Sequence, residues 1–533
     1  MLKRLIGIAT AVATISTMAV TAFADEPYDT YSYDNWDDPI PSQAGYMVER
    51  TWMGHDLGLD KLSDPDSKFF ISKSESPNLN AAADMYIEDS TRTIWVADTG
   101  NNRILCFNED FVLKGCYKTI DGAEKSNFAA PRGLFVEVDK NGDTILYVAD
   151  TENSRAVKLK VTGALTCELQ QDFLKPTSQA YSAEAFSPSK VIVDKEGNVY
   201  LVATTVNTGA LRYDKNGEFK GYFGANRVQQ TAEVIARKVW RIFASEEQLQ
   251  AMATTVPTEF HNFDMDEDGF IYTVTESVNA DTDAVKKLNP AGYNIWNNAK
   301  GNEYHFGDIA RDYDEGVAKK TKLTDIVVGD NDVFNVLDYE SGRVFQYDKN
   351  ADLLFIFGTK SQPSEQEGSF TSPNAVETLG TKVYVLDGLK NDITVFDETV
   401  FGKYVHEASV LNVEGKYTEA KPIWEEVMKR DGGYTMAHIA LGKACLNAGE
   451  YKQAMKYFKT AYDQENYDKA YEYYRDEFLR EHFEVIVIGL VVFFILVAVY
   501  SHLKKKKIIW SITECLAFVL YKISGAFKSL MRR

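Results

Sequence analysis

The chain has 533 residues with a formal net charge of −20 at pH 7, and 45% of its residues are hydrophobic. A chain of this length is too long to fold around a single hydrophobic core, so we expect several domains. The acidic balance repels phosphate backbones and argues against nucleic acid as a partner. The five cysteines are too few and too scattered for a disulfide framework, so we expect no structural disulfide.

Residues 1–24 have the form of a cleaved secretory signal. They begin with Lys3 and Arg4, continue with an apolar stretch, and end in a small-x-small sequence before Asp25. Residues 25–45 form an acidic lead-in that we expect to be extended and exposed. Its aromatic side chains suit either a spacer or a surface that stacks on a sugar polymer. These side chains are Tyr28, Tyr31, Tyr33 and Trp36.

A motif of strand, polar turn and strand repeats through residues 46–400. Residues 94–104 (IWVADTGNNRI) return 52 positions later as residues 146–156 (LYVADTENSRA), and self-similarity at a fixed spacing indicates a repeat architecture. Apolar residues alternate within each strand, as half-buried strands require. Weaker copies follow, which makes six in all. The weaker copies lie at 199–213, 271–288, 333–347 and 383–396.

Further strands complete a four-stranded unit around most copies. A strand that begins at a proline comes before the copy and ends in a turn such as that from Asp139 to Gly142, where glycine supplies a positive backbone angle. An outer strand such as 219–223 follows several copies. Six such units predict a mainly β fold, a six-bladed β-propeller in which each sheet is buried against its neighbours. We expect residues 46–52 to close the ring as the outer strand of the sixth blade.

The Val-Ala-Asp-Thr-x-Asn-x-Arg pattern of residues 94–104 and 146–156 resembles the NHL repeat family. The resemblance is specific in the first two copies and only architectural in the other four. It implies a six-bladed propeller that serves chiefly as an interaction platform. The related propellers also include zinc-dependent lyases and calcium-dependent lactonases, so an enzyme has to be considered.

Polar residues of the two best copies form a candidate partner-binding rim, because turns inside the repeated hairpins share one face of a propeller. The alternative is structural, with Asp and Asn shaping the hairpin and Arg packing between neighbouring blades. Residues 228–256 interrupt the β pattern with apolar residues at helical spacing and a capping box, which predicts a helical insertion over the same rim. The candidate rim residues are Asp98, Asn101, Asn102, Arg103, Asp150, Asn153 and Arg155.

One turn and the strand before it hold the weak candidates for a metal site. Asp264, Asp266 and Asp268 have the spacing of alternate calcium ligands, but Thr275 stands where a bidentate Glu is needed. A plain turn is therefore the alternative. Zinc catalysis needs about three convergent ligands, and His261 is the single propeller histidine that we place on an inner strand facing the axis. We expect no metal site, no cofactor and no catalytic residue.

The period changes to 34 residues after position 400. Residues 414–420 (EGKYTEA) recur as 448–454 (AGEYKQA), and the Gly-x-Tyr-x-x-Ala pattern at this offset closely resembles the tetratricopeptide repeat. We expect two helical pairs over 401–468 and a charged, tyrosine-rich capping helix over 467–483. The aromatic residues expected to pack between these helices are Tyr417, Trp424, Tyr451 and Phe458.

Residues 485–503 carry no charged side chain and extend about 29 Å at ~1.5 Å per residue, which is enough to cross a bilayer. Four lysines follow at 504–507, which predicts a cytoplasmic tail and an external segment from residue 25 to about residue 484. Residues 503–533 carry eight Lys or Arg and one Glu, whereas residues 1–502 carry a net charge of −27. We expect 508–533 to form an amphipathic helix on the inner leaflet, with a second crossing as the alternative.

These features together predict a bacterial-type, single-pass surface protein. We expect a non-enzymatic scaffold whose propeller rim and helical groove hold protein partners at the cell surface, with a cell-envelope or transporter-associated assembly as the setting. Two other classes stay open. One is a metal-dependent lyase or hydrolase that would use His261, Asp264 and Glu259 in the central channel, and the other is a cell-surface polysaccharide binder.

Overall fold

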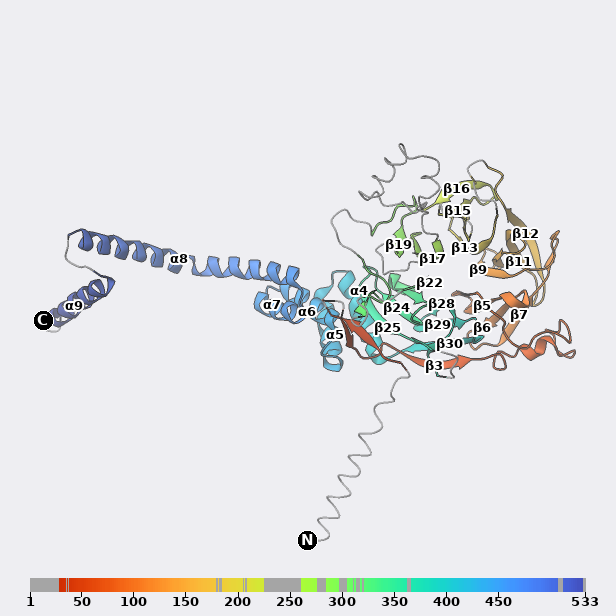
Figure 1. Ribbon diagram of the computed structural model, residues 1–533, viewed down its shortest axis with the longest axis horizontal. Coiled ribbons are helices and arrows are strands. Elements are labelled where there is room, and N and C mark those ends of the chain that lie inside the picture. Colours follow the sequence, from red (N-terminus) through yellow and green to blue (C-terminus); the bar gives the residue numbers. More distant parts are fainter. Residues whose placement is uncertain are drawn as a thin grey trace, which may run out of the picture. The chain divides into compact units, whose positions relative to one another are not determined.

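The computed structural model describes residues 28–530 except 35, 37, 179–180, 182–184, 205, 207–208, 225–259, 276–283, 297–303, 310, 313–316, 319–320, 362–365 and 507–510. The expected signal, the expected insertion at 228–256 and Glu259 lie outside the described residues. The chain divides into two compact units, Met1–Ala440 and Leu441–Arg533. The first unit contains a six-bladed β-propeller, and the second contains helices (Figure 1).

Six antiparallel sheets form the blades, and the first strand of each blade lies nearest the axis. These first strands contact one another in a closed series that runs β4, β9, β13, β17, β22, β28 and back to β4, so they surround a common centre (Figure 1). Blade 1 consists of β4 (Asp84–Glu88), β5 (Thr93–Asp98), β6 (Arg103–Asn108) and β7 (Leu113–Tyr117). Blade 2 consists of β9 (Pro131–Val138), β10 (Thr144–Asp150), β11 (Arg155–Val161) and β12 (Cys167–Leu174), with β8 (Ile120–Asp121) beside β12.

The other four blades follow the same order. Blade 3 consists of β13 (Pro188–Val193), β14 (Val199–Ala203), β15 (Ala210–Tyr213) and β16 (Phe219–Phe223). The described strands of blade 4 are β17 (Phe260–Met265), β18 (Ile271–Thr275) and β19 (Val285–Leu288). Blade 5 consists of β22 (Leu323–Val328), β23 (Phe334–Asp338), β24 (Arg343–Tyr347) and β25 (Leu353–Phe357). Blade 6 consists of β28 (Pro373–Leu379), β29 (Lys382–Asp387), β30 (Asp392–Glu398) and β3 (Tyr46–Trp52).

The N-terminal strand closes the ring. Strand β3 pairs with β30 in antiparallel register from Tyr46 opposite Glu398 to Trp52 opposite Ile393. The expectation that residues 46–52 supply the outer strand of the sixth blade is therefore confirmed. This closure joins the two ends of the propeller sequence in one sheet, with β3 as its outer strand.

Local sequence explains the tight turns between strands. In the turn after β9, Asp139 accepts hydrogen bonds from the backbone N–H groups of Asn141 and Asp143, and Gly142 has a φ of 82°. Glycine reaches this left-handed region without steric cost, which makes it the favoured residue there. The same arrangement recurs with Asp194 and Gly197, so the turn prediction is confirmed.

Apolar side chains fill the spaces between neighbouring blades. Burial is highest on the second and third strands, where Ile94, Val96 and Leu105 belong to one cluster that extends into blade 6. Close approach needs a small residue at Gly133, because a Cβ there would lie 2.4 Å from the carbonyl oxygen of Ser189 in the next inner strand. Cys106, Cys116, Cys167 and Cys445 are buried, and none of the four is paired in a disulfide.

The lead-in packs onto the propeller and is partly buried there. Strands β1 (Tyr31–Tyr33) and β2 (Pro39–Pro41) form a hairpin, and the buried Tyr28 donates a hydrogen bond to the Tyr46 carbonyl at 3.0 Å. Tyr33 donates to Asp308 Oδ1 at 2.8 Å. The prediction of an exposed segment is wrong for these tyrosines, because contacts with distant parts of the propeller bury their rings. Trp36 is exposed.

Short elements also lie between the blades. A 3-10 turn, η1 (Leu59–Leu62), lies between β3 and β4 and buries its two leucines. Two minor two-stranded pairs complete the described strands of the first unit. They are β20 (Arg311–Asp312) with β21 (Val317–Ala318), and β26 (Thr359–Lys360) with β27 (Ser369–Phe370).

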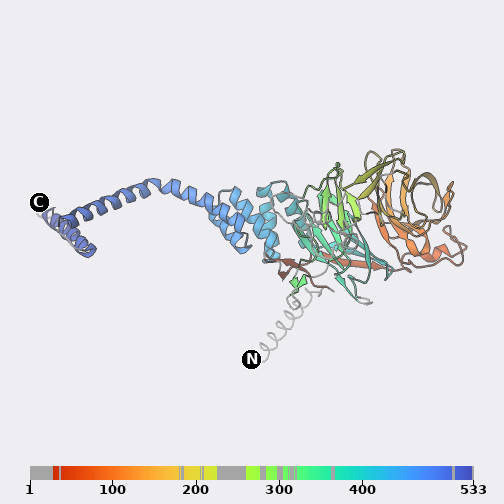
Figure 2. The ribbon, with the colours of Figure 1, turned by 45° about the horizontal axis from the view of Figure 1, so that its top comes forward.

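Helices follow blade 6. Helix α4 (Val400–Val413) begins directly after β30, and the Thr399 hydroxyl accepts the N–H of Gly402 as its N-cap. Helix α5 (Tyr417–Arg430) is antiparallel to it, and its Trp424 is fully buried. Figure 2 shows α4 and α5 beside the blade that precedes them. Helix α6 (Thr435–Asn447) contains the division between the two units.

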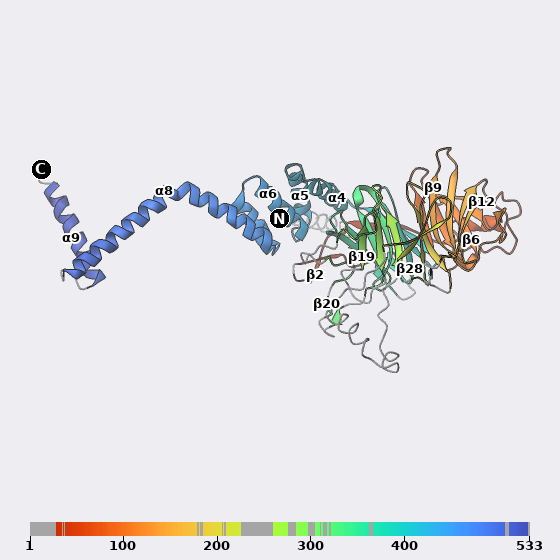
Figure 3. The ribbon, with the colours of Figure 1, turned by 90° about the horizontal axis from the view of Figure 1, so that it is seen from above.

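The second unit ends in a long helix. Helix α7 (Tyr451–Thr460) packs against the start of α8 (Gln464–Lys505), which is uninterrupted for 42 residues (Figures 2 and 3). The expected capping helix and the apolar run are thus parts of one helix, which no proline breaks. In the described part of the chain, one helix is long and apolar enough to cross a membrane, and this helix is α8. Helix α9 (Ile512–Leu530) follows it.

Candidate functional site

The propeller has two distinct ends. Because strands alternate in direction, the turns between second and third strands lie at one end, which we call the motif end and define by Thr99–Asn101 and residues 151–154. Turns between first and second strands lie at the opposite end. We call this the helix end, because β30 runs toward it and α4 begins there. The predicted rim belongs to the motif end.

At the motif end, the predicted rim residues of blade 1 make intramolecular bonds. Asp98 and Arg103 are fully buried, and their Oδ2 and Nε atoms lie 2.6 Å apart. The other oxygen of Asp98 accepts the N–H of Asn80 at 2.7 Å. Asn101 donates to the Asn78 carbonyl at 3.0 Å and to Asp98 at 2.9 Å. These bonds tie the turn to the segment that precedes the inner strand of the same blade.

Blade 2 repeats this arrangement. Arg155 Nε lies 2.9 Å from Asp150 Oδ2, and Asn153 donates to the Asn127 carbonyl at 2.9 Å. Asn102 accepts the N–H of Ala130 at 2.7 Å and so links blade 1 to blade 2. The contacts are those of the structural alternative, in which the motif builds the hairpin and the blade seam. Partner binding by the exposed part of this rim stays a prediction.

Two equivalent aspartates were not among the predicted residues. Asp338 of blade 5 accepts the N–H of Lys322 at 2.8 Å, and Asp387 of blade 6 accepts the N–H of Thr371 at 2.6 Å. Both follow a Val-Leu pair at the end of a second strand. That position within the repeat was the sequence signal that could have identified them.

The weak metal candidates do not come together as a ligand set. His261 is exposed on β17, and Asp264 Oδ2 accepts the N–H of Val328 in the next blade at 2.7 Å. Asp266 accepts two backbone N–H groups of its own turn, and its other oxygen lies 3.2 Å from Lys287 Nζ. Asp268 lies at the helix end. Among the described residues, no group of three or more His, Cys, Asp or Glu could hold a metal ion.

Charged residues from alternate blades meet at the centre of the propeller. Asp84, Lys190 and Asp325 occupy equivalent register positions on the inner strands of blades 1, 3 and 5. Lys190 pairs with Asp84 and lies 3.7 Å from Asp325 Oδ1. Burial raises the pKa of Asp325 to about 7 and that of Asp264 to about 6. No single motif indicates this cluster, because its members lie in different repeats.

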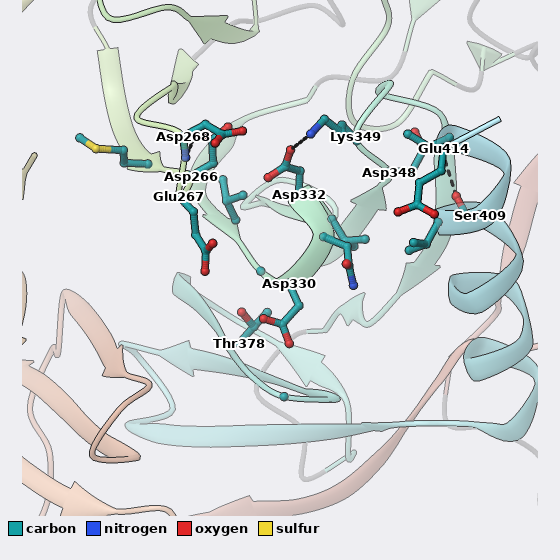
Figure 4. A pocket seen from close by; sticks show the side chains of 18 of the residues that line it. Asp266, Glu267, Asp268, Asp330, Asp332, Asp348, Lys349, Thr378, Ser409 and Glu414 are labelled. Carbon is teal, nitrogen blue, oxygen red and sulfur yellow. Dashed lines mark hydrogen bonds and ion pairs between the residues drawn. The ribbon is translucent and has the colours of Figure 1, made fainter. Parts of the chain in front are cut away.

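A pocket of about 590 Å³ opens at the helix end (Figure 4). The pocket is lined by loops between strands of blades 1, 4, 5 and 6 and by the C-terminal end of α4. Both the propeller and the helix that follows it therefore contribute to the pocket. Its lining has eight carboxylates and one lysine. The carboxylates are Asp89, Asp266, Glu267, Asp268, Asp330, Asp332, Asp348 and Glu414, and the lysine is Lys349.

The local electrostatics of this acidic pocket are strongly negative. Lys349 Nζ lies 2.5 Å from Asp332, and this bond raises the pKa of the lysine. Burial and then the charge of Asp330 raise the pKa of Asp89. Burial raises the pKa of Asp348 to about 6, and Ser409 of α4 donates a hydrogen bond to it at 3.0 Å. The exposed carboxylates are therefore acceptors suited to a cationic group.

Polar contacts fix α4 to the propeller beside this pocket. His406 Nε2 lies 2.6 Å from Gln346 Oε1 of blade 5, and His406 Nδ1 contacts Glu398. Gln346 in turn donates to Tyr46 Oη at 2.9 Å and Asn335 Oδ1 at 3.0 Å. This network joins α4 to β3, β23, β24 and the end of β30. These bonds keep α4 and the blades that line the pocket in a fixed position relative to each other.

A second hollow lies within the helical unit. It has a volume of about 610 Å³ and is formed by the start of α7 and the first half of α8. Acidic and aromatic side chains dominate its lining. Among them are Glu450, Tyr451, Tyr474, Glu477, Phe478 and Glu481.

Comparison with known proteins finds one family match and several similar solved structures. Residues 414–473 match the tetratricopeptide repeat. Virginiamycin B lyase from Staphylococcus aureus is similar in structure at 10% identity and a TM-score of 0.35, covering 70% of this chain and 97% of that chain. A gluconolactonase from Xanthomonas campestris is similar at 11% identity and a TM-score of 0.36, covering 60% and 88%. Among curated proteins, no match is found.

The assignment of the propeller rests on the strand pairing described above. A propeller joined to tetratricopeptide repeats indicates a protein-interaction scaffold, since both kinds of module generally mediate contacts between proteins. The long apolar helix is consistent with attachment to a membrane.

Proposed function

We propose that this protein is a membrane-anchored scaffold of the cell surface that binds a protein partner at the acidic pocket. The pocket itself is the observation that carries the proposal. Four blades and α4 build it jointly, so the propeller and α4 act as a single binding unit. Its excess of carboxylates favours a partner segment that presents lysine or arginine side chains.

Exposed acidic residues give the pocket its capacity for an incoming cation. Asp89, Glu267 and Asp330 are exposed, line the pocket and lie on turns of three different blades. Figure 4 shows Glu267 and Asp330 among the side chains that line it. A cationic side chain that enters would gain charge-assisted hydrogen bonds and relieve the repulsion between Asp89 and Asp330. Charge complementarity of this kind gives specificity and fast association.

The apolar half of α8 is the proposed anchor. Positive residues at 504–507 favour the cytoplasmic side for the end of α8 and the external side for the propeller. The signal-like residues 1–24 support the same orientation. The Asp98–Arg103 and Asp150–Arg155 pairs support an NHL-type propeller. We propose an envelope assembly that contains transporter components as the setting.

Affinity capture of the full-length protein from detergent-solubilised membranes tests the proposal. The pocket variant carries Asp89→Asn, Glu267→Gln and Asp330→Asn, which remove three charges without breaking a hydrogen bond that these side chains make among the described residues. The matched control carries Asp60→Asn, Asp121→Asn and Glu124→Gln, three exposed acids elsewhere on the propeller.

We expect wild type and control to recover the same stoichiometric partner, and the pocket variant to lose it. A partner retained equally by all three proteins would contradict the pocket assignment. Recovery of no stoichiometric partner by the wild type would contradict the scaffold function.

A further inference from the structure

The helix that follows the proposed membrane anchor has an apolar face that is exposed in the described part of the chain. Leu516, Leu520 and Ile523 of α9 are each more than half exposed, and their spacing of four and three residues places them on one side of the helix. Phe527 and Leu530 continue this spacing in the sequence. Glu514, Tyr521 and Ser524 lie on other sides of the helix. Such a face, about two turns or more long, suits the boundary between lipid tails and headgroups.

Basic residues precede this apolar face in the sequence and also lie within α9. Lys504 and Lys505 end α8, and the exposed Lys522 lies within α9. Residues 503–533 carry a net charge of +7 in a chain that is otherwise strongly acidic. Each lysine near an anionic membrane surface contributes attraction to it. The charge therefore favours an anionic lipid surface as the occupant over the acidic remainder of this chain.

The chain length between the two helices fixes the side of the membrane. Six residues, 506–511, separate α8 from α9. Fully extended, they reach about 20 Å, which is less than the ~30 Å hydrocarbon thickness. The start of α9 therefore stays near the leaflet in which α8 ends.

We propose that α9 lies along the cytoplasmic leaflet with its apolar face inserted, and that Lys504, Lys505, Lys506 and Lys522 bind anionic phospholipid headgroups. The inference rests on the proposed anchoring by α8 and goes beyond it, because it assigns a lipid class to the tail. The scaffold is thereby held at two adjacent points, the spanning helix and the surface helix.

Amide hydrogen exchange of the full-length protein in lipid nanodiscs tests this assignment. Discs of phosphatidylcholine alone are compared with discs in which about a third of the lipid is phosphatidylglycerol. We expect α9 amides to exchange at least about tenfold more slowly in the anionic discs. Replacing the four lysines by glutamine is expected to remove that difference between the discs.

Two matched variants test the helix face. Leu516→Gln, Leu520→Gln and Ile523→Gln should abolish protection of α9, whereas Ala517→Gln, Tyr521→Gln and Ser524→Gln should leave it in place. Equal protection in the two lipid compositions would overturn the headgroup assignment. Rapid exchange of α9 in both would overturn the surface location, and so would accessibility of Arg533 from the external side.

The amide exchange rate of α8 distinguishes failure of the tail assignment from failure of the proposed membrane anchor. Slow exchange over 485–503 together with unprotected α9 would overturn the tail assignment alone. Rapid exchange over 485–503 would instead overturn the proposed membrane anchor.

Discussion

Lys190 of blade 3 lies 3.7 Å from Asp325 of blade 5 across the centre of the propeller. The same ammonium group pairs with Asp84 of blade 1, so one side chain connects three alternate blades. Each carboxylate also accepts a backbone N–H from the following blade, Asp84 from Leu134 and Asp325 from Val376, both at 2.7 Å. The centre of the ring is therefore held by ion pairs as well as by inner-strand packing.

Replacing Lys190 by methionine should destabilise the propeller by ~3–5 kcal/mol at pH 7.5, because two carboxylates are left buried without their cation. Denaturant unfolding of the full-length protein in detergent measures the change. Adding Asp325→Asn to Lys190→Met removes one uncompensated charge and should recover part of the loss. If Lys190→Met and the wild type were equally stable, the central ion pairs would make no net contribution to the free energy of unfolding.

Stability should increase when the pH falls from 7.5 to 5.5. Burial raises the pKa of Asp325 to about 7 and of Asp264 to about 6, above the ~3.9 of an unfolded aspartate. In this range the folded protein takes up protons that the unfolded chain does not, so protons favour folding, and the effect is lost as pH rises through 6 and 7. Each pKa unit corresponds to about 1.4 kcal/mol.

Thermal unfolding at the two pH values checks this dependence. The variant Asp325→Asn should show a smaller increase in Tm on acidification than wild type. A Tm that falls from pH 7.5 to pH 5.5 in the wild type contradicts the assignment of these groups.

Arg103→Met should cost at least ~3 kcal/mol, because Asp98 loses its buried partner and the carbonyls of Ser76 and Asn78 lose donors. Faster hydrogen exchange should appear in residues 75–80, which Arg103 holds in place. Arg132→Met is the matched control, since Arg132 is exposed on the neighbouring blade. Similar unfolding midpoints for the two variants would refute a structural role for the motif arginine.

His406→Ala should loosen α4 from the propeller while the blades stay folded. The substitution removes contacts with both Gln346 and Glu398, and leaves Gln346 Oε1 without that donor. Limited proteolysis should then cleave between β30 and α5 sooner than in wild type. An unchanged cleavage pattern would indicate that Ser409 and its bond to Asp348 suffice to hold the helix.

Features set by neighbouring residues could be predicted from the sequence. Alternation of apolar residues and the Asp139-to-Gly142 type of turn define strands and hairpins locally, and their repetition implies the propeller. Closure by residues 46–52 followed because one outer strand was still needed. The 34-residue period likewise indicated helical pairs, and the buried Trp424 and Phe458 pack as expected.

Features that depend on distant residues could not be predicted. Tyr33 is held by Asp308, 275 positions away, and nothing in the lead-in itself indicates this partner. To predict the central cluster of Asp84, Lys190 and Asp325, one would need to know how the inner strands of three blades are aligned with one another. The acidic pocket collects carboxylates from separate turns and from α4, so none of its members stands out in a single motif.

Site-specific photo-crosslinking shows whether a protein partner occupies the acidic pocket. A photoreactive residue is placed at Glu267 in the pocket or at Glu124 outside it, in the full-length protein within the membranes of cells that make it. We expect one discrete covalent adduct with a protein partner from position 267 and none from position 124. No adduct from position 267, or the same adduct from both positions, would contradict it.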